Sequence, residues 1–536
     1  MFREQRISRM KRQLKEIAGN TFYQLMIVYT ICVLLIALGF LSKYTLQFHI
    51  FAVMLGILGV SIIPEETSKV KINRKVHYIF FLGAVLIIFA FRSIPYLGNS
   101  VPLGYDPGLY KYGIEYGLIN LDSWILSGGM EPGFLYLMIP FKFLFSSQFI
   151  LTWLFIFFSL LLGLSIYFFT REFLGEQSAL FSLLIFSLSV IQFKTFWYLY
   201  YKNVIGLSFM LFSMYFLAKY EKSEKRLFLG LFIVLGGLVL SVHRPTFYIF
   251  GISYFLYALI SPYRKGNYNF NKLKINILSG ILIGLIGMSF YAGKFLPAIT
   301  NILPFVAEGF ISPGESPGTF ISFFYYQYSA LLYLPFAIIG LFYFLKKKEF
   351  NMIVIWAIIN LSIVYFQFFF FNRFIIHLDI VLIILSGQGL SILFEDKRKL
   401  FIMLSLALMI SGLFFISNES TASKPLLSEK ALSFIERIPE LTEENSKIMV
   451  ISSEYSPWVK GYSGRTTIAP GLFDENKWGE EEWEIFWTAT DMQKTREMMS
   501  VYEKPIYLYA GTKSFNNPCF SLYIENNGEK IYKYDC

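Results

Sequence analysis

From residue 21 to residue 416 the chain alternates between long apolar segments and short polar segments, many of them basic. Each apolar segment, of about 17 to 23 residues, is long enough to cross roughly 30 Å of hydrocarbon as a helix. We predict membrane spans near 21–41, 46–63, 77–94, 149–170, 177–193, 203–219, 227–242, 245–260, 275–292, 324–345, 351–370, 377–394 and 400–416. The pattern therefore predicts a polytopic α-helical membrane protein with about 13 transmembrane helices.

Two apolar or basic segments are not predicted to cross. Residues 131–145 are apolar but barely long enough, and they contain Pro132 and Pro140, so we interpret them as an interfacial helix. The basic head, residues 1–20, precedes the first span without the short apolar core and small-residue cleavage site of a signal peptide. We expect this head to stay attached and to be cytoplasmic.

The basic short loops determine the predicted orientation. With the head inside, all of them fall on the cytoplasmic face, as the positive-inside rule requires. These loops are 69–75, 219–226, 264–274, 346–348 and 397–399. The same count places loops 95–148 and 293–323 and the tail 418–536 outside, around a membrane domain of residues 21–417.

Composition agrees with this division. Hydrophobic residues make up 55% of the chain and charged residues 16%, which excludes an ordinary water-soluble globule. The tail has 13 Lys and Arg against 19 Asp and Glu, a net charge of −6, which leaves +16 for the first 417 residues. This positive charge lies in short loops, where it orients helices against an anionic leaflet, so we predict no nucleic-acid partner.

The tail has the pattern of a small extracytoplasmic α/β domain. Amphipathic segments predict helices near 429–438 and 480–502, and β-branched and aromatic runs predict strands near 447–452, 466–469, 505–510 and 529–534. Cys519 and Cys536 both lie in this tail. A disulfide between them and two free thiols are both compatible with the sequence.

Asp106 is the leading candidate for chemistry. It lies in the motif GYDPGLYKYGIEY, in the first large outer loop, just past the end of a predicted span. Asp-Pro-Gly is also the composition of a plain β-turn, which is the alternative role for this residue. Glu115, nine residues further on, is a secondary candidate acid.

Several cations are predicted near the same face. Arg244 in SVHRPTFY and Arg373 in FNRFIIHLD lie at outer helix ends, and arginine suits bidentate contacts with a phosphate. His243 and Lys202 join them as candidate donor-binding residues, although for Lys202 we favour a side chain that only reaches the lipid interface. Asp379 lies inside a span, where an acid is a candidate functional residue by default and where pairing with a Lys or Arg is the plain alternative.

Loop 293–323 contains four prolines and two further secondary acids, Glu308 and Glu315. Long loops of this kind often cover a site, and they also occur as passive connectors. The two acids are candidates to reach a metal or an acceptor.

Thirteen spans, an inner N-terminus, an acid in the first outer loop and an outer C-terminal domain together resemble the GT-C superfamily of polyprenyl-phosphate-dependent glycosyltransferases. GYDPGLYKYGIEY resembles the first-loop Asp motif of that superfamily, and residues 170–181 resemble its short cytoplasmic link. Residues 456–478 are similar to the acceptor-recognition region of oligosaccharyltransferase catalytic subunits. The matching residues there are Trp458, Gly461, Tyr462 and Arg465. The resemblance places the side chains of Trp458, Tyr462 and Arg465 on the acceptor side.

Departures from the family pattern concern the acceptor and the metal. The Trp-Trp-Asp-Tyr-Gly element of that family reads here as residues 457–461, Pro-Trp-Val-Lys-Gly, without the acceptor-binding Asp. The loop KTFWYLYYKN has no carboxylate, so the acidic pair that helps to hold a divalent metal is missing. The sequence therefore identifies no particular cofactor. A divalent metal remains an open alternative, although the loop KTFWYLYYKN does not support it.

The leading hypothesis is an inverting membrane glycosyltransferase with Asp106 as general base. It would move a sugar from a polyprenyl phosphate to a glycan, lipid or protein acceptor on the extracytoplasmic face of the cell membrane. The alternatives are a transporter or flippase of a lipid-linked sugar, a polysaccharide polymerase or ligase, and a non-catalytic scaffold. A transporter would be favoured by interrupted helices, which the sequence does not clearly show.

Overall fold

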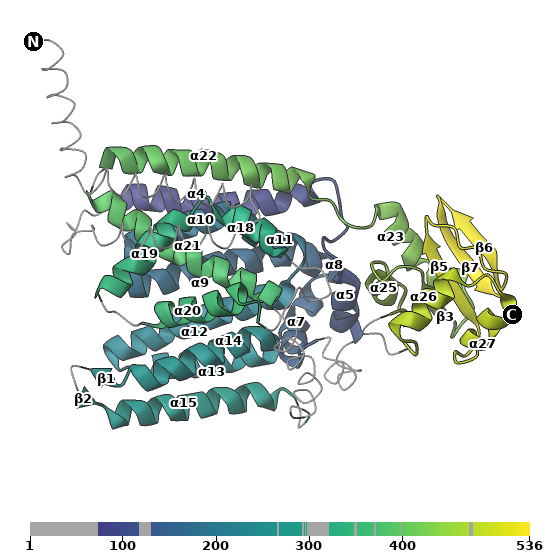
Figure 1. Cartoon of the computed structure of the whole chain (residues 1–536), viewed down its shortest axis with the longest axis horizontal. Helices are drawn as coiled ribbons and strands as arrows, with labels where there is room; N and C mark the ends of the chain where they lie inside the picture. The colour runs from purple at the N-terminus through teal and green to yellow at the C-terminus, as the bar shows by residue number, and fades with distance from the viewer. Residues whose placement is uncertain are drawn as a thin grey trace, which may run out of the picture.

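In a computed structural model of the protein, a helical bundle carries a small sheet-containing domain at one end (Figure 1). The structure describes residues 73–116, 130–264, 267–291, 294, 296, 321–347, 351–368, 371–396, 398–470 and 475–536. The head 1–20, the predicted spans 21–41 and 46–63, and both Glu308 and Glu315 lie outside the described residues. We call the end of the bundle beside the C-terminal domain the domain end.

Every predicted span from residue 77 onward corresponds to a helix or to a pair of helices. The helices are α4 (Arg74–Ser93), α9 (Phe155–Leu174, preceded by α8, Ser147–Phe149, and η2, Ile150–Leu154), α10 (Glu176–Leu188), α11 (Val190–Trp197), α12 (Tyr201–Ser223), α13 (Arg226–Val242), α14 (Arg244–Ile260), α15 (Phe270–Ser289), α18 (Phe323–Ala330), α19 (Leu334–Lys347), α20 (Met352–Tyr365), α21 (Phe371–Asp396) and α22 (Arg398–Ala422). The predicted interfacial helix is the short helix α7 (Pro132–Leu144), and a small β1–β2 hairpin (Tyr263–Arg264 and Asn267–Tyr268) joins α14 to α15.

Length and composition make several of these helices suitable for a bilayer. Among the described residues, five helices are long and apolar enough to cross a membrane, or up to seven if each bent pair forms one span. The chain is therefore a multi-pass membrane protein. The number of about 13 spans stays a prediction.

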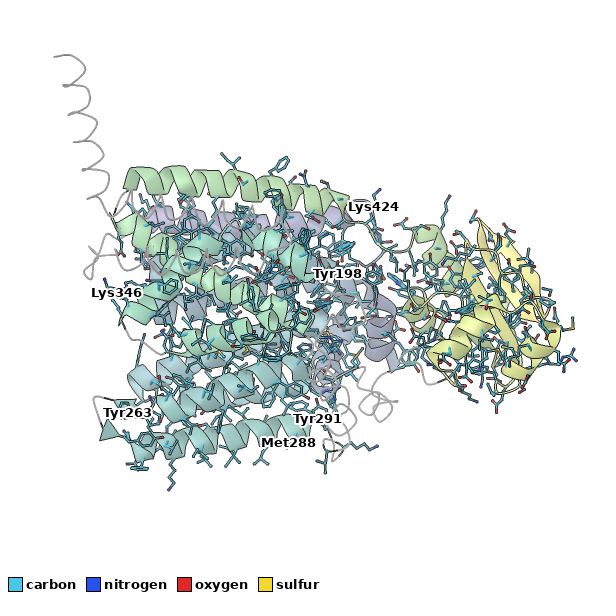
Figure 2. The ribbon with its side chains drawn as sticks, viewed as in Figure 1. Tyr198, Tyr263, Met288, Tyr291, Lys346 and Lys424 are labelled. Atoms are coloured by element: carbon cyan, nitrogen blue, oxygen red, sulfur yellow. A yellow bond between two sulfur atoms is a disulfide. The ribbon has the colours of Figure 1, made fainter. Side chains whose placement is uncertain are left out.

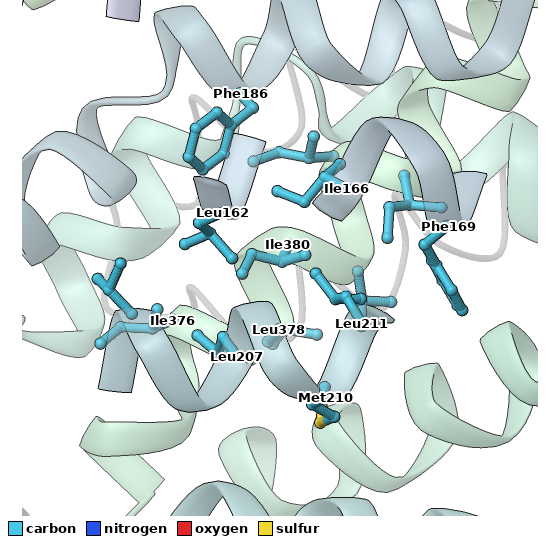
Figure 3. Close-up of a cluster of buried hydrophobic side chains, with 14 of the residues drawn as sticks. Leu162, Ile166, Phe169, Phe186, Leu207, Met210, Leu211, Ile376, Leu378 and Ile380 are labelled. Atoms are coloured by element: carbon cyan, nitrogen blue, oxygen red, sulfur yellow. The ribbon is translucent and has the colours of Figure 1, made fainter. Parts of the chain in front are cut away.

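Helix α21 lies at the centre of the bundle, and its most apolar stretch of 18 residues is fully buried. Its side chains pack with those of α9, α10 and α12, as the cluster around Ile380 and Leu207 shows (Figure 3). Glycines allow one neighbour to come especially close, because a Cβ on Gly340 of α19 would lie 2.0 Å from the Leu385 carbonyl oxygen. Small residues permit such close approach of helices in membranes.

Two of the predicted spans are interrupted, which the sequence did not reveal. The axes of α10 and α11 differ by 54°, and those of α18 and α19 by 81°. Ser189 marks the first break: it lies between α10 and α11, and its side chain caps α11 by accepting a hydrogen bond from the Gln192 N–H. A hydroxyl at this position satisfies a backbone donor that the interruption would otherwise leave free.

The C-terminal domain is built on a five-stranded sheet with strand order β4-β3-β5-β7-β6. Its strands are β3 (Lys447–Val450), β4 (Thr466–Ile468), β5 (Ile506–Gly511), β6 (Phe520–Asn526) and β7 (Glu529–Tyr534). β3 is parallel to β4 and to β5, whereas β7 is antiparallel to both β5 and β6. Alternate residues of β3 face two separate apolar clusters: Ile448 and Val450 one, Met449 the other.

Helices cover both faces of this sheet. α23 (Glu429–Glu436), followed by α24 (Ile438–Leu441), covers one face, and α26 (Glu480–Thr488) and α27 (Met492–Met499) cover the other. The last two replace the single helix predicted over 480–502, because Asp491 caps a new helix by accepting from the N–H groups of residues 493 and 494. The structure also joins Cys519 and Cys536 in a disulfide.

The two ends of the bundle carry different groups. Lys346 and Tyr263 lie at the end remote from the C-terminal domain, and Tyr198 and Lys424 lie at the domain end (Figure 2). Ion pairs tie the basic loops of the remote end to neighbouring helices, with 2.9 Å from Lys222 to Glu172. The end with basic loops is thus opposite the end with the domain, as the charge pattern predicted.

Candidate active site

Asp106 lies at the domain end, immediately before helix α5 (Pro107–Tyr116). Its backbone carbonyl accepts a hydrogen bond from the Tyr110 N–H at 3.1 Å, and Pro107 occupies the first helical position, where proline is favoured. Asp-Pro-Gly therefore begins a helix here. The β-turn that we considered as its plain structural role is wrong.

Gly108 is needed for docking of the C-terminal domain. A Cβ at this position would lie 1.9 Å from the Pro457 carbonyl oxygen, and a Cβ on Gly461 would lie 1.9 Å from the Gly108 carbonyl oxygen. The backbone of α5 thus touches the segment formed by α25 (Ser456–Trp458) and η3 (Val459–Ser463). Lys111 adds a hydrogen bond from its ammonium to the Gly461 carbonyl at 3.2 Å.

The three residues predicted on the acceptor side take part in this docking or in the domain core. The Trp458 side chain is fully buried and stacks on Tyr462, with 5.6 Å between ring centroids. The Tyr462 hydroxyl donates to Gln148 at 3.2 Å, and Arg465 donates to the Pro439 carbonyl at 3.0 Å. In this conformation their contacts are with the protein itself, and their assignment to the acceptor side stays a prediction.

Glu131 is the residue that sequence reasoning missed. It directly precedes α7, it is only 3% exposed, and its carboxylate lies 2.6 Å from the Lys202 ammonium. Its other oxygen lies 3.6 Å from Arg244 Nε. Burial alone would raise the pKa of Glu131, but the positive charges of Lys202 and Arg244 lower it to about 2. Glu131 directly precedes Pro132 at the start of a predicted helix in an outer loop, and this position could have marked it as a candidate site residue.

Lys202 and Arg244 both contact Glu131, and their predicted role in donor binding stays a prediction. Lys202, at the start of α12, forms a mostly buried ion pair with Glu131. The interpretation that its side chain only reaches the lipid interface is therefore wrong. Arg244, at the start of α14, is 4% exposed and is held against Glu131. Its guanidinium is buried beside the Glu131 carboxylate.

Asp106 interacts electrostatically with Lys202 and with Arg373, which lies at the start of α21. Both Asp106 and Arg373 have exposed side chains. Desolvation by the surrounding protein nevertheless raises the pKa of Asp106. The positive charges of Lys202 and Arg373 lower this pKa but do not cancel the effect of desolvation. The structure thus brings an accessible carboxylate together with two cations.

His243 interacts electrostatically with Glu131, whereas Glu115 has other partners. His243 caps α14, and its ring is hydrogen-bonded to the Thr246 hydroxyl at 2.7 Å, which in turn contacts His377 at 3.2 Å. Glu115 forms an ion pair with Lys111 at 3.0 Å. Nine helical residues correspond to about 13 Å and about two and a half turns, so Glu115 lies on the opposite side of the helix from Asp106 and does not join its cluster.

Asp379 is surrounded by neutral groups. Ser189 donates to its carboxylate at 3.0 Å, Gln192 at 2.8 Å, and the Tyr333 hydroxyl also donates to it. The alternative that Asp379 pairs with a Lys or Arg is wrong. Because Ser189 and Tyr333 lie at the two helix breaks, this acid fastens both interruptions to α21.

The described cluster is a poor fit for a divalent metal. Lys202, Arg244 and Arg373 surround the carboxylates of Asp106 and Glu131, so positive charge already exceeds negative charge there. Among the described residues, no three His, Cys, Asp or Glu side chains gather as a metal site. The arrangement is instead suited to an anionic group, such as a phosphate.

Comparison with known families supports a glycosyltransferase fold. Residues 132–291 match the family described as dolichyl-phosphate-mannose-protein mannosyltransferase. This segment includes α7, α12, α14 and three of the site residues: Lys202, His243 and Arg244. No curated protein sequence gives a significant match.

Solved structures with similar folds include the oligosaccharyltransferase AglB of Archaeoglobus fulgidus. Its complex with an inhibitory peptide and a dolichol-phosphate matches with a TM-score of 0.56 and 13% identity, over 81% of this chain and 69% of that one. Its complex with zinc and sulfate gives 0.56 and 14%, over 81% and 68%. The form tethered to an acceptor peptide gives 0.55 and 14%, over 82% and 69%. The predicted resemblance to the GT-C superfamily is confirmed.

Proposed function

We propose that the protein is an inverting glycosyltransferase that moves a sugar from a polyprenyl-phosphate donor to an acceptor on the extracytoplasmic face of the cell membrane. The carrying observation is the electrostatic interaction of Asp106 with Lys202 and Arg373, at the domain end of a GT-C fold. A base and two cations within one cluster match the needs of the reaction, which are proton removal and stabilisation of a departing phosphate.

In the proposed reaction an acceptor hydroxyl or amide attacks the anomeric carbon of the sugar. The bond between that carbon and the phosphate oxygen breaks, and the electron pair leaves with the polyprenyl phosphate. Asp106 takes the proton of the acceptor, while Lys202 and Arg373 stabilise the charge that develops on the phosphate. Glu131 holds Lys202 in place and is itself held by Arg244. Asp106, Lys202 and Arg373 each contribute about 10²-fold or more to the rate.

The partners follow from this chemistry and from the similar fold. The structure of AglB holds a dolichol-phosphate and an inhibitory peptide, and an Archaeoglobus fulgidus oligosaccharyltransferase has been tethered to an acceptor peptide. These complexes support a lipid-linked donor for this chain. We propose that the lipid lies against the bundle in the bilayer and that the acceptor, a glycan, lipid or protein, approaches from the domain end. Tyr462 and the docked domain would border the path of that acceptor.

Purified protein incubated with a labelled polyprenyl-phosphate sugar tests the proposal. We expect release of free polyprenyl phosphate in the presence of an acceptor. Intact donor after prolonged incubation with a panel of hexose donors and acceptors would contradict it.

A transporter or flippase of a lipid-linked sugar is the second candidate. It is favoured by the two interrupted helix pairs that meet at the buried Asp379, since transporters often bind substrate at broken helices. Movement of an intact lipid-linked sugar between leaflets, without cleavage, would favour it over transfer. A polymerase or ligase would also cleave the donor, but its product would be an extended polysaccharide.

A further inference from the structure

An aromatic cluster borders Asp106 at the domain end. Tyr105 directly precedes Asp106, and its ring lies 6.4 Å from that of Tyr198. Tyr198 also lies 5.8 Å from Tyr200 and 4.8 Å from Trp197. All four side chains are partly exposed. We call these four residues the aromatic platform.

Backbone geometry fixes the platform beside the acid. Leu199 adopts φ of 57°, a left-handed conformation that is rare for a bulky residue, and its own side chain is buried. This turn between α11 and α12 presents Tyr198 and Tyr200 on either side of it. Gly104, with φ of 90°, lies so close that a Cβ would be 2.8 Å from the Tyr198 carbonyl oxygen. Unusual backbone of this kind is retained where the surrounding structure demands it, often at binding sites.

The platform lies next to the charged cluster. Tyr200 interacts electrostatically with both Arg373 and Asp106. Aromatic residues of a membrane-interface belt face the lipid and are spread around a bundle. Here the rings come from two segments far apart in the sequence and pack on one another beside one carboxylate, which is the geometry of a binding surface.

We infer that the aromatic platform binds the sugar ring of the donor, next to the phosphate held by Lys202 and Arg373. A pyranose presents a face of C–H bonds, and the electron-rich face of an aromatic ring attracts their positive edge. Phenol hydroxyls can in addition bond to the sugar hydroxyls. This subsite rests on the proposed function, because it assumes a lipid-phosphate-linked sugar as substrate.

Binding measurements on the purified full chain test the subsite separately from transfer. The probes are dolichyl phosphates that carry mannose, glucose or galactose, and dolichyl phosphate without a sugar. We expect wild-type protein to bind at least one sugar-bearing lipid more tightly than the bare lipid. Tyr198→Leu should weaken binding of that lipid about tenfold and leave binding of the bare lipid unchanged, since stacking of this kind is worth about one power of ten.

Tyr198→Phe keeps the ring and should bind like wild type within about threefold, since its loss is limited to one hydroxyl contact. Tyr105→Leu is a second test of the platform, and Tyr263→Leu, at the remote end of the bundle (Figure 2), is the matched control. Unchanged bare-lipid binding also reports that each variant is folded. Equal loss of both lipids, or no loss in the Leu variants, would overturn the subsite, as would a wild-type protein without preference for a sugar. Transfer without such preference would leave the proposed function intact.

Discussion

Asp106 and Asp379 occupy two polar regions of one bundle, and the partners of the two acids differ in kind. Asp106 is accessible, and Lys202 and Arg373 lie near it. Asp379 is fully buried, and hydroxyl and amide groups surround it. The first region holds more positive than negative charge, and the second holds one acid that neutral donors satisfy.

This difference suits the Asp106 region to catalysis and the Asp379 region to a structural role. Cations can respond to charge that develops on a bound phosphate. Neutral donors that are already engaged with Asp379 have little left to offer a substrate, but they hold two broken helices against α21. A buried acid in a membrane domain is a functional suspect by default, and its partners are what decide between these roles.

Replacement of each acid in turn should give the largest difference in transfer rate between the two regions. We expect Asp106→Asn to lower the rate of sugar transfer by about 10²- to 10⁴-fold, because the amide cannot accept the proton of the acceptor. Asp379→Asn should change that rate less than tenfold, since Asp379 does not touch the reacting groups. Steady-state rates of lipid phosphate release measure both, and similar losses in the two variants would refute the division of roles.

Glu131→Gln should cause the largest loss of stability. The change leaves the buried charges of Lys202 and Arg244 without their carboxylate, which costs about 3–5 kcal/mol in comparable buried pairs. Glu497→Gln in the exposed Lys494 pair is the control, with an expected effect below about 1 kcal/mol. Unfolding in detergent measures both, and equal effects would show that the Glu131 network is not stabilising.

Low pH should remove the same contribution of Glu131 to stability. The pKa of Glu131 is about 2 in the folded protein, against about 4.3 in an unfolded chain. Its stabilisation is therefore fully present above the unfolded value and is lost as the pH falls through the folded one. The stability difference between wild type and Glu131→Gln should shrink between about pH 4.3 and pH 2; a difference that is constant over this range would contradict the assignment.

Gly461→Ala tests whether the Asp106 region depends on the docked domain. The added methyl group would collide with the Gly108 carbonyl and displace α5, and a shift of about 1 Å near reacting groups can cost roughly 10²-fold in rate. Gly479→Ala is the control in the same domain, since its nearest neighbour would be 3.8 Å away. Transfer rates and protease sensitivity of the domain report the result; an active Gly461→Ala variant would show that docking does not position Asp106.

The smallest expected effect is that of Asp379→Asn on stability. Asparagine keeps one acceptor oxygen and turns an NH₂ group toward neighbouring donors, which costs about 1–3 kcal/mol. Unfolding measurements should place this variant between the Glu497→Gln control and Glu131→Gln. A loss larger than that of Glu131→Gln would mean that Asp379 carries more of the fold than its neutral partners imply.

Much of the fold could be predicted because it depends on local pattern. Apolar length located the helices from residue 77 onward, and β-branched and aromatic runs located four of the five strands of the C-terminal sheet. Strand β6 was missed although Asn527 and Gly528, both with positive φ, are a strong hairpin signal that joins it to β7. The helix breaks at Ser189 and near Tyr333 were missed because their cause, hydrogen bonds to Asp379, comes from distant sequence.

The candidate site was predictable only in part for the same reason. Asp106, Arg373 and Arg244 could be singled out by residue type and position at helix ends. The partner of Arg244 could not, because Glu131 is separated from it by more than a hundred residues and meets it only through packing of α7 and α14. The role of Gly108 in docking likewise depends on Gly461, which lies in another domain.

The pH dependence of single-turnover transfer tests the role of Asp106 most directly. The surrounding protein raises the pKa of Asp106, and a general base works only when ionised, so the wild-type rate should fall as the pH decreases through a value above the usual 3.9 of an aspartate. The residual rate of Asp106→Asn should lack this acid limb. An acid limb that persists unchanged in the variant, with transfer near the wild-type rate, would contradict the account.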